Sequence, residues 1–85
     1  MNIKLEYPFE FEGREIKSLE FRRLKTGEIA RATNRTDELK TAINVAAISA
    51  GLPVAAIEEI DAADFATISE ELSDAGFFNH STKRM

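Results

Sequence analysis

The sequence predicts an α+β domain, in which an N-terminal antiparallel β-hairpin packs on three or four short helices. Apolar and polar residues alternate over residues 3–11, which is the period of a strand with one buried face. After residues 25–27 the apolar residues recur at three and four positions, which is the helical period. The 85-residue chain has room for one domain. We expect that domain to span residues 1–78, followed by a disordered basic tail at 79–85.

The first strand is predicted from five apolar residues that share one face: Ile3, Leu5, Tyr7, Phe9 and Phe11. Pro8 has no amide proton for a sheet ladder, so this strand is expected at an edge. A turn follows at residues 12–14, where Gly13 tolerates a positive φ.

The return strand is predicted over residues 15–23. Its apolar residues Ile16 and Leu19 are three positions apart, so they cannot share one face of a regular strand. A bulge or bend near Lys17 and Ser18 would bring them back into phase. Two strands alone are marginally stable in water, so the apolar face of the hairpin needs helices on it.

Two helices are predicted in the middle of the chain. Thr26 is expected to cap the first, over residues 27–33, with Glu28 in the first turn. Thr36 is expected to cap the second, which ends at Ala50. The helix-breaking signal at residues 34–36 is weak, so one long bent helix is the alternative.

Two more helices follow. Gly51 ends the second helix, and Pro53 suits the first position of a short helix through Glu59. Asp61 is expected to cap the last helix, at residues 62–75, before Gly76. One apolar stripe runs along that last helix: Phe65, Ile68, Leu72 and Ala75.

The net charge is -4, and its distribution is uneven. Residues 41–82 hold seven Asp and Glu residues and no Lys or Arg. This half of the chain should repel phosphate, which argues against nucleic acid, and it allows a basic protein partner. An acidic face kept only for solubility is an equally good interpretation. The chain has no cysteine, so thiolate metal sites are excluded.

Few residues suggest catalysis. Asp61 and Asp64 would share a helix face as a metal or acid–base pair, although a cap with a first-turn carboxylate is the better interpretation. Arg22, Arg23 and Lys25 form a candidate phosphate patch, or the outward side of a strand end. No positioned nucleophile and base are present in the pattern, so we predict a non-enzymatic protein that needs no cofactor or metal.

The second predicted helix has two opposed apolar stripes. One contains Ile43 and Ala46, and the other contains Val45 and Ile48 and continues to Leu52. Two stripes need two packing surfaces. The hairpin can supply one, and the second is the last helix with Phe65, Ile68 and Leu72, another copy of the chain, or a client. We expect a self-association or client surface, with a wholly internal contact as the alternative. The predicted protein-binding residues are these five with two carboxylates of the last helix: Ile43, Val45, Ala46, Ile48, Leu52, Glu70 and Glu71.

Two motifs together carry a family resemblance. The first is LEFRR at residues 19–23 leading into TGEI at 26–29. The second is SAGLP at 49–53 followed by Ile57, EID at 59–61 and DF at 64–65. In order and spacing, residues 3–73 resemble the tail assembly chaperones of Mu-like contractile-tailed bacteriophages and prophages. Leu24 and Glu28 depart from the proline and aspartate that many members have, and the tail from Asn79 has no counterpart.

The resemblance implies a chaperone that binds the tape measure protein and keeps it soluble during tail assembly. It further implies the bacterial host cytoplasm as location, absence from the mature virion, and in many members a frameshifted longer form. We also expect a homo-oligomer and no membrane association. The alternatives are a small nucleic-acid-binding regulator and a structural subunit of a phage particle.

Overall fold

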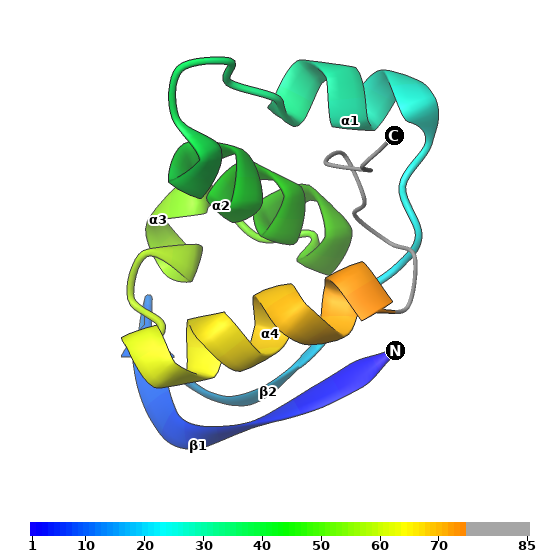
Figure 1. The fold of residues 1–85 in the computed structure, drawn as a ribbon. Helices are drawn as coiled ribbons and strands as arrows, with labels where there is room; N and C mark the ends of the chain where they lie inside the picture. The colour runs from blue at the N-terminus through cyan, green and yellow to red at the C-terminus, as the bar shows by residue number, and fades with distance from the viewer. Residues whose placement is uncertain (75–85) are drawn as a thin grey trace.

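The computed structural model describes residues 1–74, in which a two-stranded antiparallel hairpin is followed by four helices (Figure 1). The predicted α+β class is therefore confirmed. The elements are β1 (Asn2–Phe11), β2 (Arg14–Glu20), α1 (Thr26–Ala32), α2 (Glu38–Ala50), α3 (Val54–Ile57) and α4 (Ala62–Asp74). The predictions for Ala75, for Gly76 and for the tail at 79–85 lie outside the described residues.

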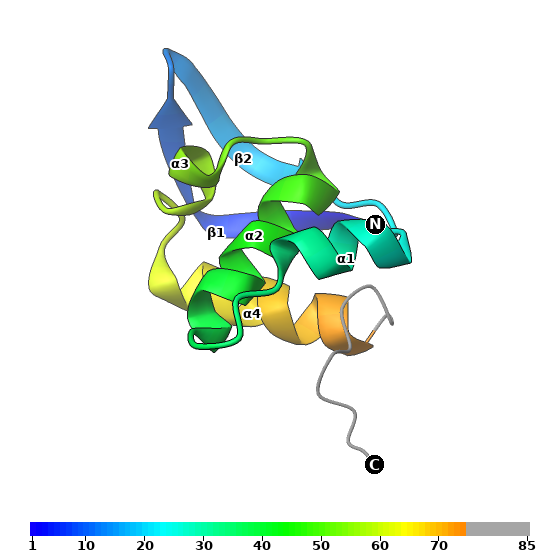
Figure 2. The same cartoon turned by 90° about the horizontal axis from the view of Figure 1, so that it is seen from above.

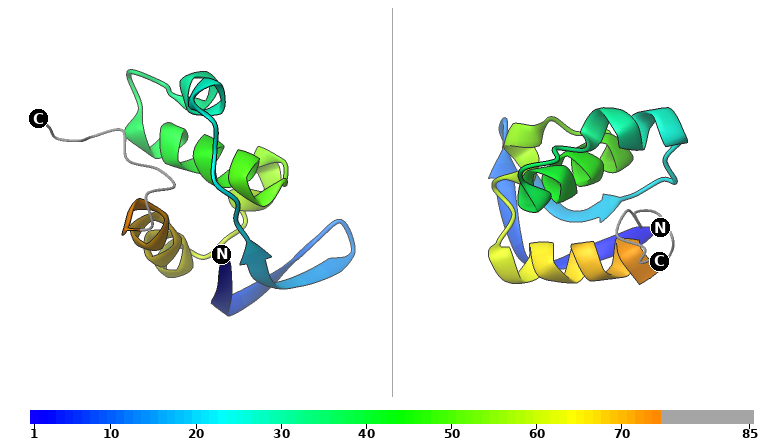
Figure 3. Two further views of the ribbon diagram at one scale, coloured as in Figure 1. Left: turned by 90° about the vertical axis from the view of Figure 1, so that its right-hand side faces the viewer. Right: turned by 45° about the horizontal axis from the view of Figure 1, so that its top comes forward.

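Helix α2 is the central element of the fold. It contacts α1, α3 and β2, and it lies between α1 on one side and α4 with the hairpin on the other (Figures 1 and 3). Seen from above, the tip of the hairpin extends beyond the helices (Figure 2). The main core joins the hairpin to α2, α3 and α4: Ile3, Leu5, Leu19, Phe21, Ala46, Ala47, Ile57, Ile60, Ile68 and Leu72.

The hairpin closes through a two-residue turn. Phe11 pairs with Arg14, and the two residues between them, Glu12 and Gly13, have φ values of 53° and 79°. Positive φ at both central residues matches the right-handed twist of the flanking strands, and glycine adopts it without strain. The predicted turn is confirmed.

The hairpin bends sharply in its middle (Figure 3). Lys4 pairs with Ser18 and Phe9 pairs with Ile16, so residues 5–8 of β1 lie opposite Lys17 alone. The irregularity therefore lies where it was predicted along β2, but the extra residues belong to β1. The reason is that Pro8 has no amide proton to donate to β2, so the hydrogen-bonded pairing of the two strands is interrupted in the segment of β1 that contains it.

The bend corrects one prediction about the buried face. Tyr7 was expected to point inward with Ile3 and Leu5, but it is 55% exposed. Alternation holds only while the strand is regular, and Tyr7 lies within the extra segment. Ile3 precedes the bend, Leu5 is the first residue of the extra segment, and both are buried in the core as predicted.

A single carboxylate fastens this bend to α4. Asp64 accepts hydrogen bonds from the amide of Glu6 at Oδ1, 3.1 Å away, and from the amide of Tyr7 at Oδ2, 2.9 Å away. Asp64 is only 6% exposed. The two amides freed by the bend are thereby paired, and α4 is held where Ile68 enters the core.

The return strand ends earlier than predicted. It was expected to reach Arg23, but β2 stops at Glu20. Phe21 still exchanges hydrogen bonds with Met1, at the start of the first strand, but the Arg22 amide turns away and donates to the carbonyl and Oγ of Ser49 in α2. The chain after β2 is therefore fastened to the C-terminal end of α2.

The predicted caps of the first two helices were each wrong by one residue, the first one residue too late in the chain and the second one residue too early. The N-cap of α1 is Lys25 rather than Thr26, since the Glu28 side chain reaches back to the Lys25 amide at 2.9 Å. The N-cap of α2 is Asp37 rather than Thr36, because a carboxylate accepts from the Lys40 amide there. The two helices are separate, which excludes the alternative of one bent helix.

The later helix ends follow the predictions more closely. Gly51 ends α2 with φ of 70°, and the Leu52 amide bonds to the Ala47 carbonyl. Pro53 precedes α3, which ends at Ile57 and not at Glu59. Asp61 caps α4 by accepting a hydrogen bond from the Ala63 amide at 3.0 Å.

The junction between β2 and α1 contains the shortest ion pair among residues 1–74. Both nitrogens of the Arg22 fork bind the Glu28 carboxylate, at 3.0 and 2.6 Å. This hydrogen bonding, together with the bond from the Lys25 amide, lowers the pKa of Glu28 to about 2. The fork thus holds the start of α1 against the end of β2.

We expect Asp64→Ala to destabilise the fold by roughly 2–4 kcal/mol, because two backbone amides lose their acceptor. Asp64→Asn should cost less, because its amide oxygen still accepts one bond. The matched control is Asp61→Ala, which removes one local cap and should cost about 1 kcal/mol. Urea unfolding measures all three, and equal costs for Asp64→Ala and Asp61→Ala would contradict this role.

We expect Glu28 to make stability depend on pH in the acid range. Its pKa is lowered in the folded chain, so its contribution is complete above the ordinary value of 4.5 and is lost as pH falls toward about 2. The gap in Tm between the wild type and Glu28→Gln should therefore shrink between pH 5 and pH 2. Glu38→Gln is the control, because that first-turn carboxylate of α2 makes no hydrogen bond or ion pair within residues 1–74. A pH-independent gap would show that the ion pair does not stabilise the fold.

Candidate protein-binding surface

The predicted protein-binding residues divide between the core and two separate surfaces. Val45 and Ala46 are 0% and 1% exposed, so no partner touches them while the chain keeps this fold. Ile43 is half-buried against the core. One of the two stripes of α2 was expected to face a partner, and the sequence did not decide which. Each stripe has a member that is buried within the domain, Ala46 in one and Val45 in the other.

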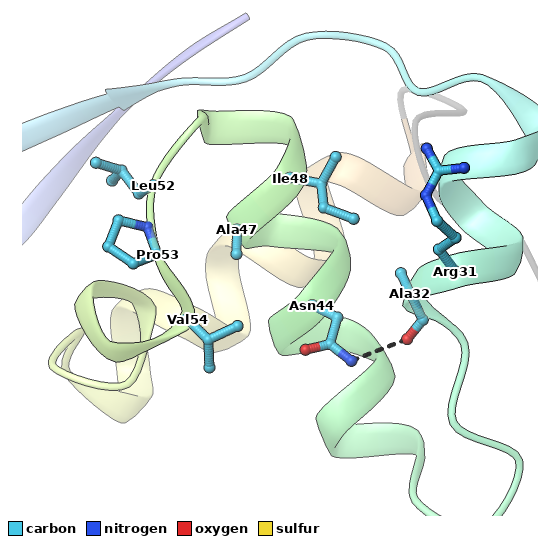
Figure 4. Close-up of a pocket in the computed structure, with 8 residues that line it drawn as sticks. All are labelled: Arg31, Ala32, Asn44, Ala47, Ile48, Leu52, Pro53 and Val54. Carbon is cyan, nitrogen blue, oxygen red and sulfur yellow. Dashed lines mark hydrogen bonds between the residues drawn. The ribbon is translucent and has the colours of Figure 1, made fainter.

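The first surface is a pocket of about 430 Å³ that runs between α1, α2 and the connection to α3 (Figure 4). We call it the α1–α2 groove. Its lining combines two predicted residues, Ile48 and Leu52, with six others: Arg31, Ala32, Asn44, Ala47, Pro53 and Val54. Small side chains at Ala32 and Ala47 leave space between the helices.

Hydrogen bonds at helix ends fix the walls of the α1–α2 groove. The Asn44 side chain donates to the Ala32 carbonyl at 3.0 Å, which ties the end of α1 to α2 (Figure 4). On the other side, the left-handed Gly51 turns the chain so that Leu52 and Pro53 leave α2 sharply. The walls are therefore rigid elements, as a preformed binding site requires.

A second hollow, of about 200 Å³, lies beside the tip of the hairpin. We call it the hairpin hollow. It shares Leu52 and Pro53 with the α1–α2 groove, and its other lining residues come from the hairpin: Phe11, Glu12, Arg14 and Ile16. The connection at residues 52–53 thus borders both hollows, and apolar surface continues from one to the other.

The second surface is the acidic side of α4, where Glu70, Glu71 and Asp74 are exposed. This helix carries no Lys or Arg, and it lies on the opposite side of α2 from α1 (Figures 1 and 3). The acidic side chains and the α1–α2 groove are therefore well separated. They can contact one partner together only if that partner wraps around the domain.

The alternative candidate sites are occupied by internal contacts. Asp61 and Asp64 each bind backbone amides, which replaces the metal or acid–base interpretation. Within residues 1–74 no group of three or more His, Cys, Asp or Glu side chains is arranged to hold a metal ion. Arg22 is paired with Glu28, so one of the three cations of the candidate phosphate patch is already neutralised.

The lining residues that were not predicted include Arg14, Arg31 and Val54. Each of these three comes from a different element, and no periodicity in one segment reports that they share a surface. The available signal was that Val54 opens a helix directly after Pro53, with no polar residue between it and Leu52. That pattern indicates exposed apolar surface only once the path of the chain is known.

The two sequence motifs that carry the family resemblance meet in space. Ser49 is 3% exposed, and its Oγ donates to the Arg22 carbonyl at 2.5 Å while accepting from the Arg22 amide at 3.0 Å. Residues 19–23 and 49–53 thus form one junction between β2 and α2. Their joint presence in the sequence has a direct structural reason.

A comparison with known protein families gives a match. The family described as "Phage tail assembly chaperone proteins, E, or 41 or 14" matches residues 2–77, which include both motifs and every described helix and strand. Searches of the curated proteins and of the solved structures found no match. No helix within residues 1–74 has the length and apolar character to cross a membrane. Since the family match covers nearly the whole sequence, the chain belongs to the phage tail assembly chaperone family.

Proposed function

We propose that this chain is a non-enzymatic chaperone that binds the tape measure protein, the long helical polypeptide that sets tail length. It keeps that client soluble until the tube subunits polymerise around it. The observation that carries the proposal is the family match over residues 2–77.

The surface of the domain suits such a client. A long helical polypeptide that has not yet been enclosed by the tube exposes apolar stripes, which aggregate unless they are covered. The α1–α2 groove offers preformed apolar surface of the kind that receives an amphipathic helix. Four members of the predicted set remain the proposed contacts: Ile48 and Leu52, which are half-buried in the groove, and Glu70 and Glu71, which are exposed.

Several properties belong to the same proposal. The chaperone acts in the bacterial host cytoplasm and leaves before the virion is complete. It forms a homo-oligomer, and it has as a second partner a frameshifted longer form of itself.

The charge distribution supports this function over a nucleic-acid-binding regulator. Seven Asp and Glu residues and no Lys or Arg lie in residues 41–74, and Arg22 is bound by Glu28. These carboxylates would repel the phosphate backbone of a nucleic acid over most of the surface that residues 41–74 form. The remaining alternative, a structural subunit of the particle, differs from a chaperone in whether the chain persists in the finished tail.

Co-expression with the tape measure protein of the same phage tests the proposal. We expect the soluble fraction of the tape measure protein to rise several-fold, because its apolar stripes are covered. The soluble client should co-purify with this chain. The measurement is the partition of the client between supernatant and pellet, with an unrelated acidic protein of similar size as control.

Two outcomes would contradict the chaperone role. One is a tape measure protein that stays as insoluble with this chain as with the control. The other is mass spectrometry of purified tails that finds this chain in fixed ratio to the tube subunit, which would identify a structural subunit.

A further inference from the structure

We propose that the α1–α2 groove seats one amphipathic helix of the client, and that a carboxylate of this helix pairs with Arg31. The inference rests on the proposed function and adds the site and the chemistry of the bound segment. It also implies that the segment is apolar and acidic. The acidic half of the chaperone alone would suggest a basic one.

The floor of the groove is apolar and partly exposed. Ile48 and Leu52 are half-buried, and Val54, on the wall opposite α1, is 39% exposed. The groove has a volume of about 430 Å³ and is open to solvent along its length, as a surface that receives a helix must be. An incoming helix would place aliphatic side chains spaced at i, i+3 and i+4 over these residues.

The guanidinium at the α1 end of the groove forms no direct bond within residues 1–74. Arg31 is exposed and lines the groove, and its charge is one of those that lower the pKa of Glu28, but it makes no ion pair or hydrogen bond with a residue of the described part of the chain. The carboxylate one turn earlier, Glu28, is bound on both oxygens by Arg22. A partner carboxylate can therefore bind the Arg31 fork without displacing an existing contact.

The walls of the groove favour a helix over an extended peptide. Its lining residues come from α1, α2, the connection at 52–53 and the first residue of α3, so no strand residue lines it. The backbone of the two helices is hydrogen-bonded mainly within each helix. An extended segment would leave its own amides without partners there, whereas a helix satisfies them internally.

A second copy of this chain is a poor occupant. Its acidic helix α4 has the right charge, but the apolar stripe of that helix is already in the core, with Ile68 and Leu72 at 0% and 2% exposed. A folded copy therefore has no free amphipathic helix of this kind within residues 1–74. The occupant is a helix of another polypeptide, and the client supplies many.

Cross-linking tests the position of the client. The chain has no cysteine, so single variants accept a thiol-directed photo-cross-linker without background. We expect Val54→Cys to cross-link the co-expressed tape measure protein at least fivefold more than Leu39→Cys. Leu39 is the matched control, because it is 62% exposed on α2 and lines neither hollow. Cross-linked client peptides should carry an apolar helical stripe and Asp or Glu.

Charge reversal tests the recognition of the carboxylate. Arg31→Glu should raise the Kd for the tape measure protein about tenfold, the effect of losing one charge pair and gaining a repulsion. Arg35→Glu reverses an exposed arginine outside the groove and should change the Kd less than twofold. Thermal unfolding of each variant confirms that the fold is intact before binding is measured.

The outcomes separate the groove from the proposed function. A wild type that does not bind the tape measure protein overturns the proposed function, and the groove assignment with it. A wild type that binds, with equal cross-linking from Val54→Cys and Leu39→Cys or with cross-links only from Glu71→Cys on α4, overturns the groove assignment alone. Cross-links from Val54→Cys to another copy of this chain also overturn it.

Discussion

The carboxylate of Asp64 holds the last helix on the bend of the first strand, and the arrangement of the other elements depends on this contact. Four residues of β1 lie opposite one residue of β2, so the strand must leave the ladder and free two amides. Asp64 accepts from both of them. The bend turns the tip of the hairpin away from α4, and it is the reason that Tyr7 faces solvent.

Helix α4 is fastened to β1 and covers only part of the apolar face of the hairpin. Helix α2 completes the core, and the bonds between Ser49 and Arg22 fix the register of its C-terminal end against the end of β2. The fork between Arg22 and Glu28 then sets where α1 begins. A series of polar contacts therefore runs from the hairpin through α2 to α1. These contacts fix the relative positions of the elements, whereas the hydrophobic effect that stabilises the core has no preferred direction.

The candidate binding surface is a consequence of this order. Because α4 covers one side of α2 and α1 covers only part of the other, a groove remains between α1 and the connection at 52–54. Its walls are helix ends that hydrogen bonds hold in place, as between Asn44 and Ala32. The pairing that orders the junction, Arg22 with Glu28, occupies both carboxylate oxygens of Glu28, so Arg31 lines the groove without a direct bond to that carboxylate.

The sequence by itself determined the class of fold, the order of elements and the turn at Glu12 and Gly13. Local period, caps and backbone preferences decide these features. It also determined the family, because two short motifs keep their order and spacing. Only the tertiary structure decided that the predicted binding positions Val45 and Ala46 are internal while Ile48 reaches a groove. Burial of a helical side chain depends on which elements pack on each side of its helix. The position of α2 depends on contacts with a distant segment, as between Ser49 and Arg22, which lie 27 residues apart in the chain.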